Sequence, residues 1–138
     1  MRQELTEFVI ETTGRRLYEI TRDVVRWVGE SGIDRGSLTL FVRHTSASLT
    51  IQENADPEVQ RDLERFLDRL VPQGDPLFRH TMEGPDDMPA HVRSLLTDVS
   101  LTIPVMDGGP VLGRWQGIYL YEHRTAPHRR RVVAQLLG

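Results

Sequence analysis

The sequence predicts an α+β fold in a single domain, with two longer helices, one short helix and mainly antiparallel strands. Apolar residues recur at helical spacing near the start and in the middle of the chain, whereas its last third alternates with the two-residue period of strands. The helical segments do not alternate regularly with strands, which argues against a parallel sheet. A chain of 138 residues is long enough to bury a core, so we expect one domain over residues 1–138.

The first third is expected to contain an edge strand, a helix and a second strand. Residues 6–13 alternate apolar and polar side chains, as an edge strand does. From residue 15 to residue 30 the apolar positions follow helical spacing, and Gly32 is placed to end the helix. Residues 37–44 return to alternation, and the face expected to be buried consists of Leu38, Leu40 and Val42.

The second helix has the clearest boundaries. Asp56 is a typical N-cap and Pro57 suits the first helical position, while Pro72 marks the end. Its expected buried stripe consists of Val59, Leu63, Phe66, Leu67 and Leu70. A polar loop rich in proline and glycine follows, and then a short helix over residues 89–96.

The last third is expected to form three strands. Residues 100–106, 113–124 and 130–137 carry strand-like patterns, and the sequence Asp-Gly-Gly-Pro at 107–110 favours a turn after the first of them.

Composition excludes several kinds of chemistry. The chain contains neither cysteine nor lysine, which rules out thiolate metal sites, a cysteine nucleophile and Schiff-base catalysis. The net charge of −3 argues against a nucleic-acid partner, although residues 124–131 hold four arginines that form either a solvated loop or an anion-binding patch. No apolar run is long enough to span a membrane and the N-terminus lacks a signal-like segment, so we expect no membrane partner and a cytoplasmic location.

Four of the five histidines stand at ends of predicted elements or in the long loop: His44, His80, His91 and His123. No two of them have the short spacing of adjacent metal ligands, so spacing alone leaves two interpretations open. Either they converge on an ion, or each one caps a helix, packs on an aromatic ring or bonds to a carbonyl. His128 lies beside arginines and is expected at the surface.

Other polar residues are equally ambiguous when taken singly. Thr45, Ser46 and Ser48 can donate to a phosphate or satisfy a turn. Asp87 can cap the short helix or act as an acid or base. A serine nucleophile is possible by residue type, but no serine has the Gly-x-Ser-x-Gly context.

Four segments in order, residues 44–67, 80–96, 100–105 and 112–124, resemble the YjbQ-like family, which is named after a secondary thiamine-phosphate synthase activity. The resemblance implies a small antiparallel β-sandwich that assembles as a homotrimer. It also implies joining hydroxymethylpyrimidine diphosphate to a thiazole phosphate with release of pyrophosphate, so that the expected ligand is a small phosphorylated molecule. A divalent metal, Zn or Mg, is expected to neutralise the leaving group.

The resemblance carries over to named positions in this sequence. The expected metal ligands are His44, His80, His91 and His123, and the expected catalytic carboxylates are Asp87 and Glu122. The expected phosphate contacts are Thr45, Ser46, Ser48 and Arg124, and the expected pocket residues are Asn54, Trp115 and Gln116. Arg114 departs from the family pattern, which has threonine there, and alternation places it on the face opposite Trp115.

Two other functions remain open at this point. The same pocket suits metal-dependent hydrolysis of a small phosphorylated or ester substrate, with Asp87 or Glu122 as the base. Alternatively, the protein binds a metal or ligand without catalysis, and the trimer is the functional unit.

Overall fold

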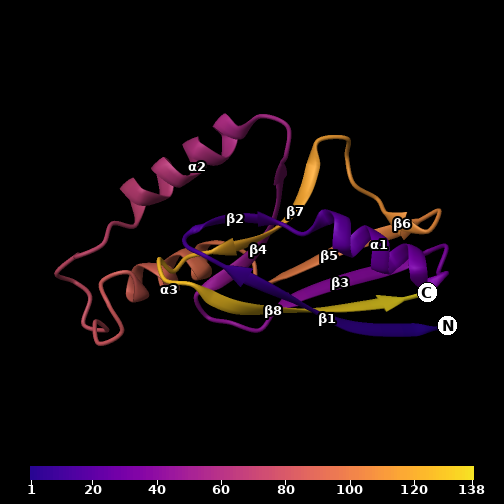
Figure 1. Cartoon of the computed structure of the whole chain (residues 1–138), viewed down its shortest axis with the longest axis horizontal. Coiled ribbons are helices and arrows are strands. Elements are labelled where there is room, and N and C mark those ends of the chain that lie inside the picture. Colours follow the sequence, from indigo (N-terminus) through magenta and orange to yellow (C-terminus); the bar gives the residue numbers. More distant parts are fainter.

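The computed structural model describes residues 1–138 and contains two antiparallel sheets and three helices (Figure 1). The five-stranded sheet has the order β1-β8-β3-β5-β6, and its strands are β1 (Gln3–Thr12), β3 (Gly36–Val42), β5 (Ser100–Met106), β6 (Gly109–Pro110) and β8 (His128–Leu137). The three-stranded sheet has the order β2-β7-β4, with β2 (Arg16–Glu19), β4 (Ala47–Glu53) and β7 (Gln116–Glu122). The predicted α+β class with antiparallel strands is confirmed.

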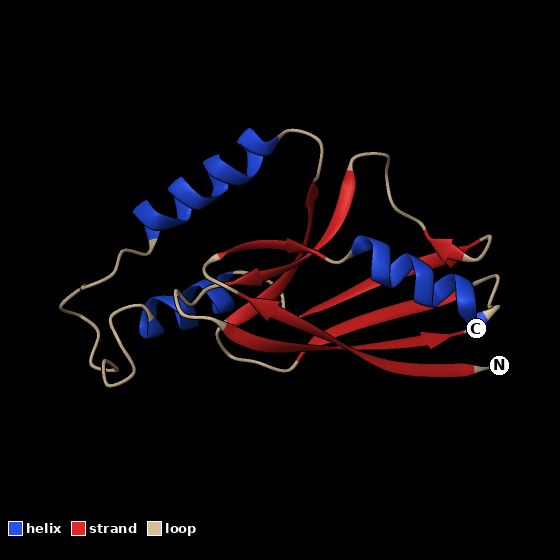
Figure 2. Cartoon of the chain, in the orientation of Figure 1, coloured by secondary structure: helices blue, strands red, loops and turns tan.

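The core lies between the two sheets and beneath one helix. Leu38, Leu40 and Val42 of β3 are buried as predicted, and they share one apolar cluster with residues of β4 and β7. Helix α1 (Thr21–Ser31) adds Val24 and Val28 to this cluster. Figure 2 shows α1 near the chain termini, whereas the other two helices lie at the opposite end of the molecule.

The outer face of the three-stranded sheet is covered by α2 (Pro57–Leu70). Leu67 of this helix packs against Leu17, Tyr119 and Tyr121. The predicted buried stripe of α2 is only partly correct, because Phe66 and Leu70 are 52% and 55% exposed. Polar contacts, such as the hydrogen bond from the Tyr121 hydroxyl to Glu64, supply much of the remaining attachment.

The helix boundaries confirm the capping predictions for the first two helices. Gly32 follows α1 with a left-handed φ of 74°, and the Asp56 side chain accepts from the Glu58 amide at 2.9 Å. The third helix, α3 (Asp87–Leu96), begins two residues earlier than predicted, and Asp86 takes the N-cap position. Asp87 is therefore the first helical residue, and its carboxylate is free for contacts outside the helix. No helix in the structure is both long and apolar enough to cross a membrane.

Two strands differ from the sequence prediction. Residues 16–19, predicted as the start of the first helix, form β2 because they pair in register with residues 119–122 of β7. Residues 47–53, which carry no predicted strand, form β4 and pair along the other edge of β7. The centre of this small sheet is therefore a strand that is covered on both faces.

Candidate metal centre

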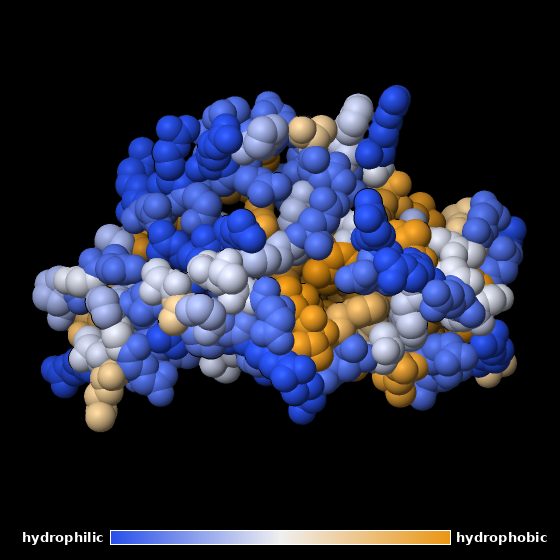
Figure 3. Space-filling model, in the orientation of Figure 1, coloured by the Kyte–Doolittle hydropathy of each residue, from blue (hydrophilic) through white to orange (hydrophobic).

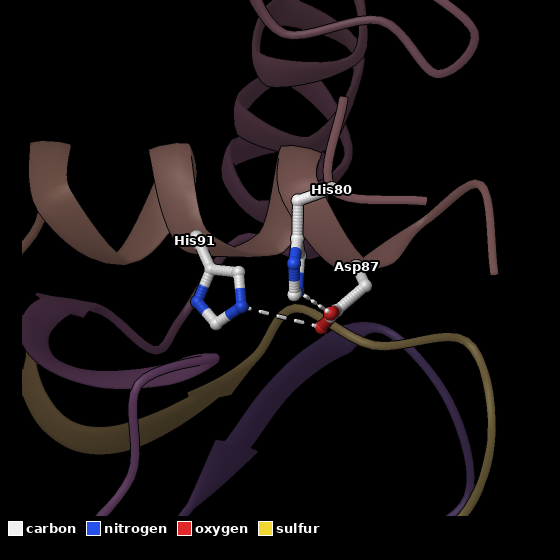
Figure 4. A group of neighbouring side chains, drawn as sticks. All are labelled: His80, Asp87 and His91. Carbon is white, nitrogen blue, oxygen red and sulfur yellow. Dashed lines mark hydrogen bonds and ion pairs between the residues drawn. The ribbon is translucent and has the colours of Figure 1, made fainter. Parts of the chain in front are cut away.

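Three side chains converge where the long loop enters α3: His80, Asp87 and His91 (Figure 4). Their ligand atoms all lie within 4.8 Å of one another. Asp87 and His91 are four residues apart on one helix, so they share a face. His80 comes from the loop between α2 and α3 and faces them. Two imidazoles and one carboxylate can supply three ligands to a divalent ion.

The orientation of His91 is fixed by a backbone carbonyl. Its Nδ1 lies 2.9 Å from the Thr45 carbonyl oxygen, which can only accept, so Nδ1 carries the proton. In the neutral ring Nε2 then presents a lone pair, and this atom lies 3.5 Å from Oδ1 of Asp87. Two acceptor atoms thus face each other, which is a favourable setting for a cation. Metal-binding histidines usually donate their second nitrogen in this way.

His80 contacts the other oxygen of the same carboxylate. Its Nε2 lies 2.6 Å from Oδ2 of Asp87, and its ring centre is 5.4 Å from that of His91. Half of the His80 side chain is exposed, whereas Asp87 is only 2% exposed. The buried carboxylate therefore links both imidazoles, and the His80 ring is the solvent-facing side of the group.

Arg124 holds the acidic turn in place. Its Nη1 lies 3.0 Å from Oδ1 of Asp87, its Nε donates to Asp86 at 2.9 Å, and its Nη2 donates to the Glu83 carbonyl at 2.9 Å. Burial acts to raise the pKa of Asp86, but hydrogen bonds from the Thr125 amide and Arg124 outweigh it and hold the pKa below its usual range. Each of the three guanidinium nitrogens of Arg124 contacts this turn, so the side chain supports the turn that carries Asp86 and Asp87.

His44 lies outside this group. Its Nε2 accepts the backbone N–H of Arg131 at 2.8 Å. Burial lowers the pKa of His44, and the charge of Arg130 lowers it further. The neutral ring therefore carries its proton on Nδ1, and neither nitrogen offers the free lone pair that the predicted metal-ligand role requires.

His123 is also separate from His80 and His91. It is almost fully buried beside the Tyr121 ring, and its Nε2 lies 2.8 Å from the Ser48 hydroxyl. Burial lowers the pKa of His123 to about 3. Ser48 is itself buried and accepts from Thr97 at 2.7 Å. The predicted roles of His123 as a metal ligand and Ser48 as a phosphate contact do not fit this enclosed network.

Glu122 forms a buried ion pair rather than an exposed catalytic base. Arg130 donates from Nε to Glu122 at 2.8 Å, and Thr12 donates to the same carboxylate at 2.6 Å. Burial acts to raise the pKa of Glu122, but the bonds from Arg130 and Thr12 outweigh it and lower the pKa. Ser46 is buried too, and its hydroxyl accepts from Arg130 at 2.9 Å. A carboxylate already satisfied by these donors is a poor base.

The three expected pocket residues lie at the far end of β7 from His123. Asn54 donates to Glu19 at 3.1 Å, and Gln116 accepts from the Gly113 amide at 2.7 Å. Trp115 is exposed, and the Arg114 guanidinium lies 5.0 Å from its ring centre. These residues shape a turn and do not line the His80–Asp87–His91 group.

The sequence contains one further signal for this group. Asp87 and His91 have the i,i+4 spacing of two metal ligands on one helix. That spacing is not apparent from the histidines alone, since the second ligand is a carboxylate. The buried partner of Glu122, Arg130, was not expected either, because it lies within the basic run at 129–131.

Known proteins of similar sequence extend over nearly the whole chain. UPF0047 protein sll1880 from Synechocystis is 49% identical over 137 residues, which cover 99% of this chain and 93% of the relative. UPF0047 protein YjbQ from Escherichia coli O157:H7 is 40% identical, and the match covers 94% of each chain. These names specify no substrate, reaction or cofactor.

The fold has close counterparts among solved structures. An uncharacterised conserved protein of the YjbQ/UPF0047 family from Clostridium acetobutylicum is 36% identical, with a TM-score of 0.86 over 96% of this chain and 99% of that one. The model of the family described as UPF0047 protein YjbQ-like matches residues 6–138. Sequence, fold and length agree, and the chain belongs to the UPF0047 YjbQ-like family.

Proposed function

We propose that the protein is a zinc-dependent hydrolase of a small ester or phosphoester. His80, Asp87 and His91 would hold the ion, each through the ligand atom that already faces the others. The observation that carries this proposal is the lone pair of His91 Nε2, held by the Thr45 carbonyl so that it faces Oδ1 of Asp87 at 3.5 Å.

The donor set favours zinc over magnesium. Two imidazole nitrogens and one carboxylate suit Zn²⁺, whereas Mg²⁺ prefers oxygen ligands and octahedral geometry. Tetrahedral zinc places its ligand atoms roughly 3.3 Å apart, close to the spacing of His91 Nε2 and Asp87 Oδ1. Three protein ligands also leave one position for water or substrate, as in catalytic rather than structural zinc sites.

The surrounding residues support such a site. When bound, the ion supplies a water of lowered pKa and polarises the substrate oxygen. Arg124 fixes Asp87 through its contact with Oδ1 at 3.0 Å, and the Thr45 carbonyl fixes His91. Half-exposed His80 leaves the open side of the group toward solvent.

The thiamine-phosphate synthase activity implied by the resemblance stays a prediction. Departure of pyrophosphate needs several cationic or hydroxyl donors. Arg124 is committed to Asp86, Asp87 and Glu83, while Ser46 and Ser48 are buried in other contacts. The homotrimer, the phosphorylated ligand and the cytoplasmic location likewise remain predictions.

Zinc binding to purified protein tests the ligand assignment. Wild-type protein should take up one zinc ion per chain, measured by elemental analysis and calorimetric titration. His91→Ala and Asp87→Asn should lose this stoichiometric binding, whereas His128→Ala, which removes a histidine outside the group, should retain it. Full zinc uptake by the His91→Ala variant would contradict the proposed centre.

Hydrolysis is tested separately on the zinc-loaded protein. We expect turnover of p-nitrophenyl acetate or p-nitrophenyl phosphate that disappears in His91→Ala. Zinc uptake without turnover of either substrate would instead support the alternative of a non-enzymatic metal-binding protein.

A further inference from the structure

A hollow of about 420 Å³ adjoins the metal group on the side of His91. Its wall includes His44, Thr45, His91, Leu95, Thr97 and Val99. The main-chain carbonyl of Thr45 is also the group that orients His91. Thr45 therefore lines the hollow and also orients a proposed metal ligand, which links the two sites.

His44 can only donate within this hollow. The backbone N–H of Arg131 occupies its Nε2 at 2.8 Å, so the neutral ring has its proton on Nδ1. Nδ1 makes no hydrogen bond within the chain. Because His44 is only half-buried, a ligand can reach its ring. A fixed N–H without a protein partner is available to an acceptor atom of a ligand.

The neighbouring side chains extend this donor character. The Thr45 hydroxyl is exposed and makes no hydrogen bond within the chain, so it can donate as well. No carboxylate lines the hollow. Arg43 and Arg130, which lie near His44, are paired with Glu7 and Glu122, so the preference for an oxyanion comes from the N–H and hydroxyl donors of the lining.

The apolar part of the lining, called the apolar wall below, consists of Leu95 and Val99, which are 80% and 40% exposed. An apolar group of a ligand would cover them and remove their surface from water. The hollow thus combines hydrogen-bond donors suited to an oxyanion with an apolar wall.

We infer that this hollow is the substrate subsite of the metal centre, in which His44 donates through Nδ1–H to an oxyanion that carries an apolar substituent. The substituent lies on Leu95 and Val99, and the oxyanion lies between His44 and the ion. His44 is thus a substrate-binding donor and not a metal ligand. This inference rests on the proposed function, since the ion supplies the other half of the oxyanion site.

The ring nitrogens of His44 can be tested independently of zinc. Nitrogen-15 NMR of the metal-free protein at neutral pH should show His44 protonated at Nδ1 and unprotonated at Nε2. The Nε2–H form would overturn the inference, whatever the result for zinc.

Two substitutions separate the two nitrogens of His44. In His44→Gln the side-chain oxygen can still accept from the Arg131 amide, but the Nδ1 donor is lost. In His44→Asn an amide N–H stands near the Nδ1 position. On zinc-loaded protein we expect phenyl phosphate to bind about tenfold more weakly to His44→Gln than to wild type, as for a lost bond to a charged group. His44→Asn should restore most of that affinity, and His128→Gln is the matched control.

The apolar wall is tested with two probes of the same charge. Phenyl phosphate should bind zinc-loaded protein about tenfold more tightly than inorganic phosphate, because the ring covers Leu95 and Val99. Leu95→Ser should reduce this preference while leaving inorganic phosphate binding unchanged. Equal affinity for both probes, or wild-type affinity in His44→Gln, would overturn the inference.

The outcomes for the two proposals are distinguishable. Failure of zinc uptake contradicts the metal centre, and the same probe comparison is then made on metal-free protein. Normal zinc uptake without any effect of His44→Gln contradicts the subsite alone.

Discussion

Glu122 illustrates how burial changes the role of a carboxylate. The pair with Arg130 is almost completely shielded from water, and a bond from Thr12 completes it. Glu122→Gln should lower the free energy of unfolding by about 3–5 kcal/mol, because the Arg130 charge is left buried without its counter-ion. Urea unfolding measures this loss, and zinc affinity per folded protein should not change.

Glu7 provides the matched control for Glu122. It also accepts from two arginines, Arg43 and Arg131, but this cluster lies at the surface. Solvent screens such pairs, so Glu7→Gln should destabilise the protein much less than Glu122→Gln. Equal losses in the two variants would show that burial is not the source of the effect.

His123 predicts an acid-side loss of stability. The free imidazole titrates near pH 6.5, whereas burial lowers the pKa of folded His123 to about 3. Between these values the unfolded chain binds more protons, so the free energy of unfolding falls as the pH is lowered from 6.5 toward 3. The His123 contribution to this slope is roughly 1 kcal/mol per pH unit.

A His123→Gln variant isolates that contribution, since glutamine can still reach the Ser48 hydroxyl but does not titrate. Urea unfolding at pH 7 and pH 5 should show a smaller stability difference in the variant than in wild type. An unchanged difference would show that His123 is not the source of the acid sensitivity in this pH range.

For single residues, the sequence indicated which residues were candidates for the site better than it indicated which of them lie close together. His80, Asp87 and His91 were all candidates, and the structure brings them together. His44 and His123 were expected with them from the resemblance to the YjbQ-like family, whereas their spacing alone left both interpretations open. Their actual partners, the Arg131 amide and the Ser48 hydroxyl, are 87 and 75 residues away in sequence. Only the register of the sheets determines such contacts.

Among the elements, α2 is attached mainly through its polar side. It contains no fully buried residue, whereas α1 contributes Val24 and Val28 to the core. Helices with few buried apolar contacts open locally at low free energy. Amide hydrogen exchange followed by mass spectrometry should therefore show less protection in α2 than in α1, and equal protection would contradict this prediction.

Element boundaries were predictable where local chemistry decides them. Asp56 and Gly32 act through neighbouring backbone groups, and both were identified from the sequence. Strands β2 and β4 were missed, because residues 16–19 and 47–53 become strands through pairing with β7. In residues 16–19, tertiary pairing overrides the local helical spacing of apolar residues. In residues 47–53, the small hydroxyl residues at the start of the segment give no clear strand pattern.

At the scale of the whole molecule, exposed apolar side chains on the five-stranded sheet offer a place to test the predicted homotrimer. The pairing register places Leu5, Val9 and Phe41 on one face of the five-stranded sheet, and all three are exposed. Figure 3 shows further hydrophobic surface between hydrophilic regions of the molecule. Polar and charged side chains, such as Glu7 and Arg131, lie between these apolar ones on the same face, and the homotrimer stays a prediction.

The homotrimer gives a mass that light scattering can measure. Size-exclusion chromatography with light scattering should yield three times the 15.8 kDa chain mass. If the outer face of the five-stranded sheet forms the contact, Phe41→Asp should reduce this mass, because a carboxylate would be buried against an apolar partner without a counter-ion. Leu77→Asp places the same charge at an exposed position in the long loop and should leave the mass unchanged. A trimer that persists in Phe41→Asp would locate the contact elsewhere, and a monomeric wild-type protein would contradict the trimer itself.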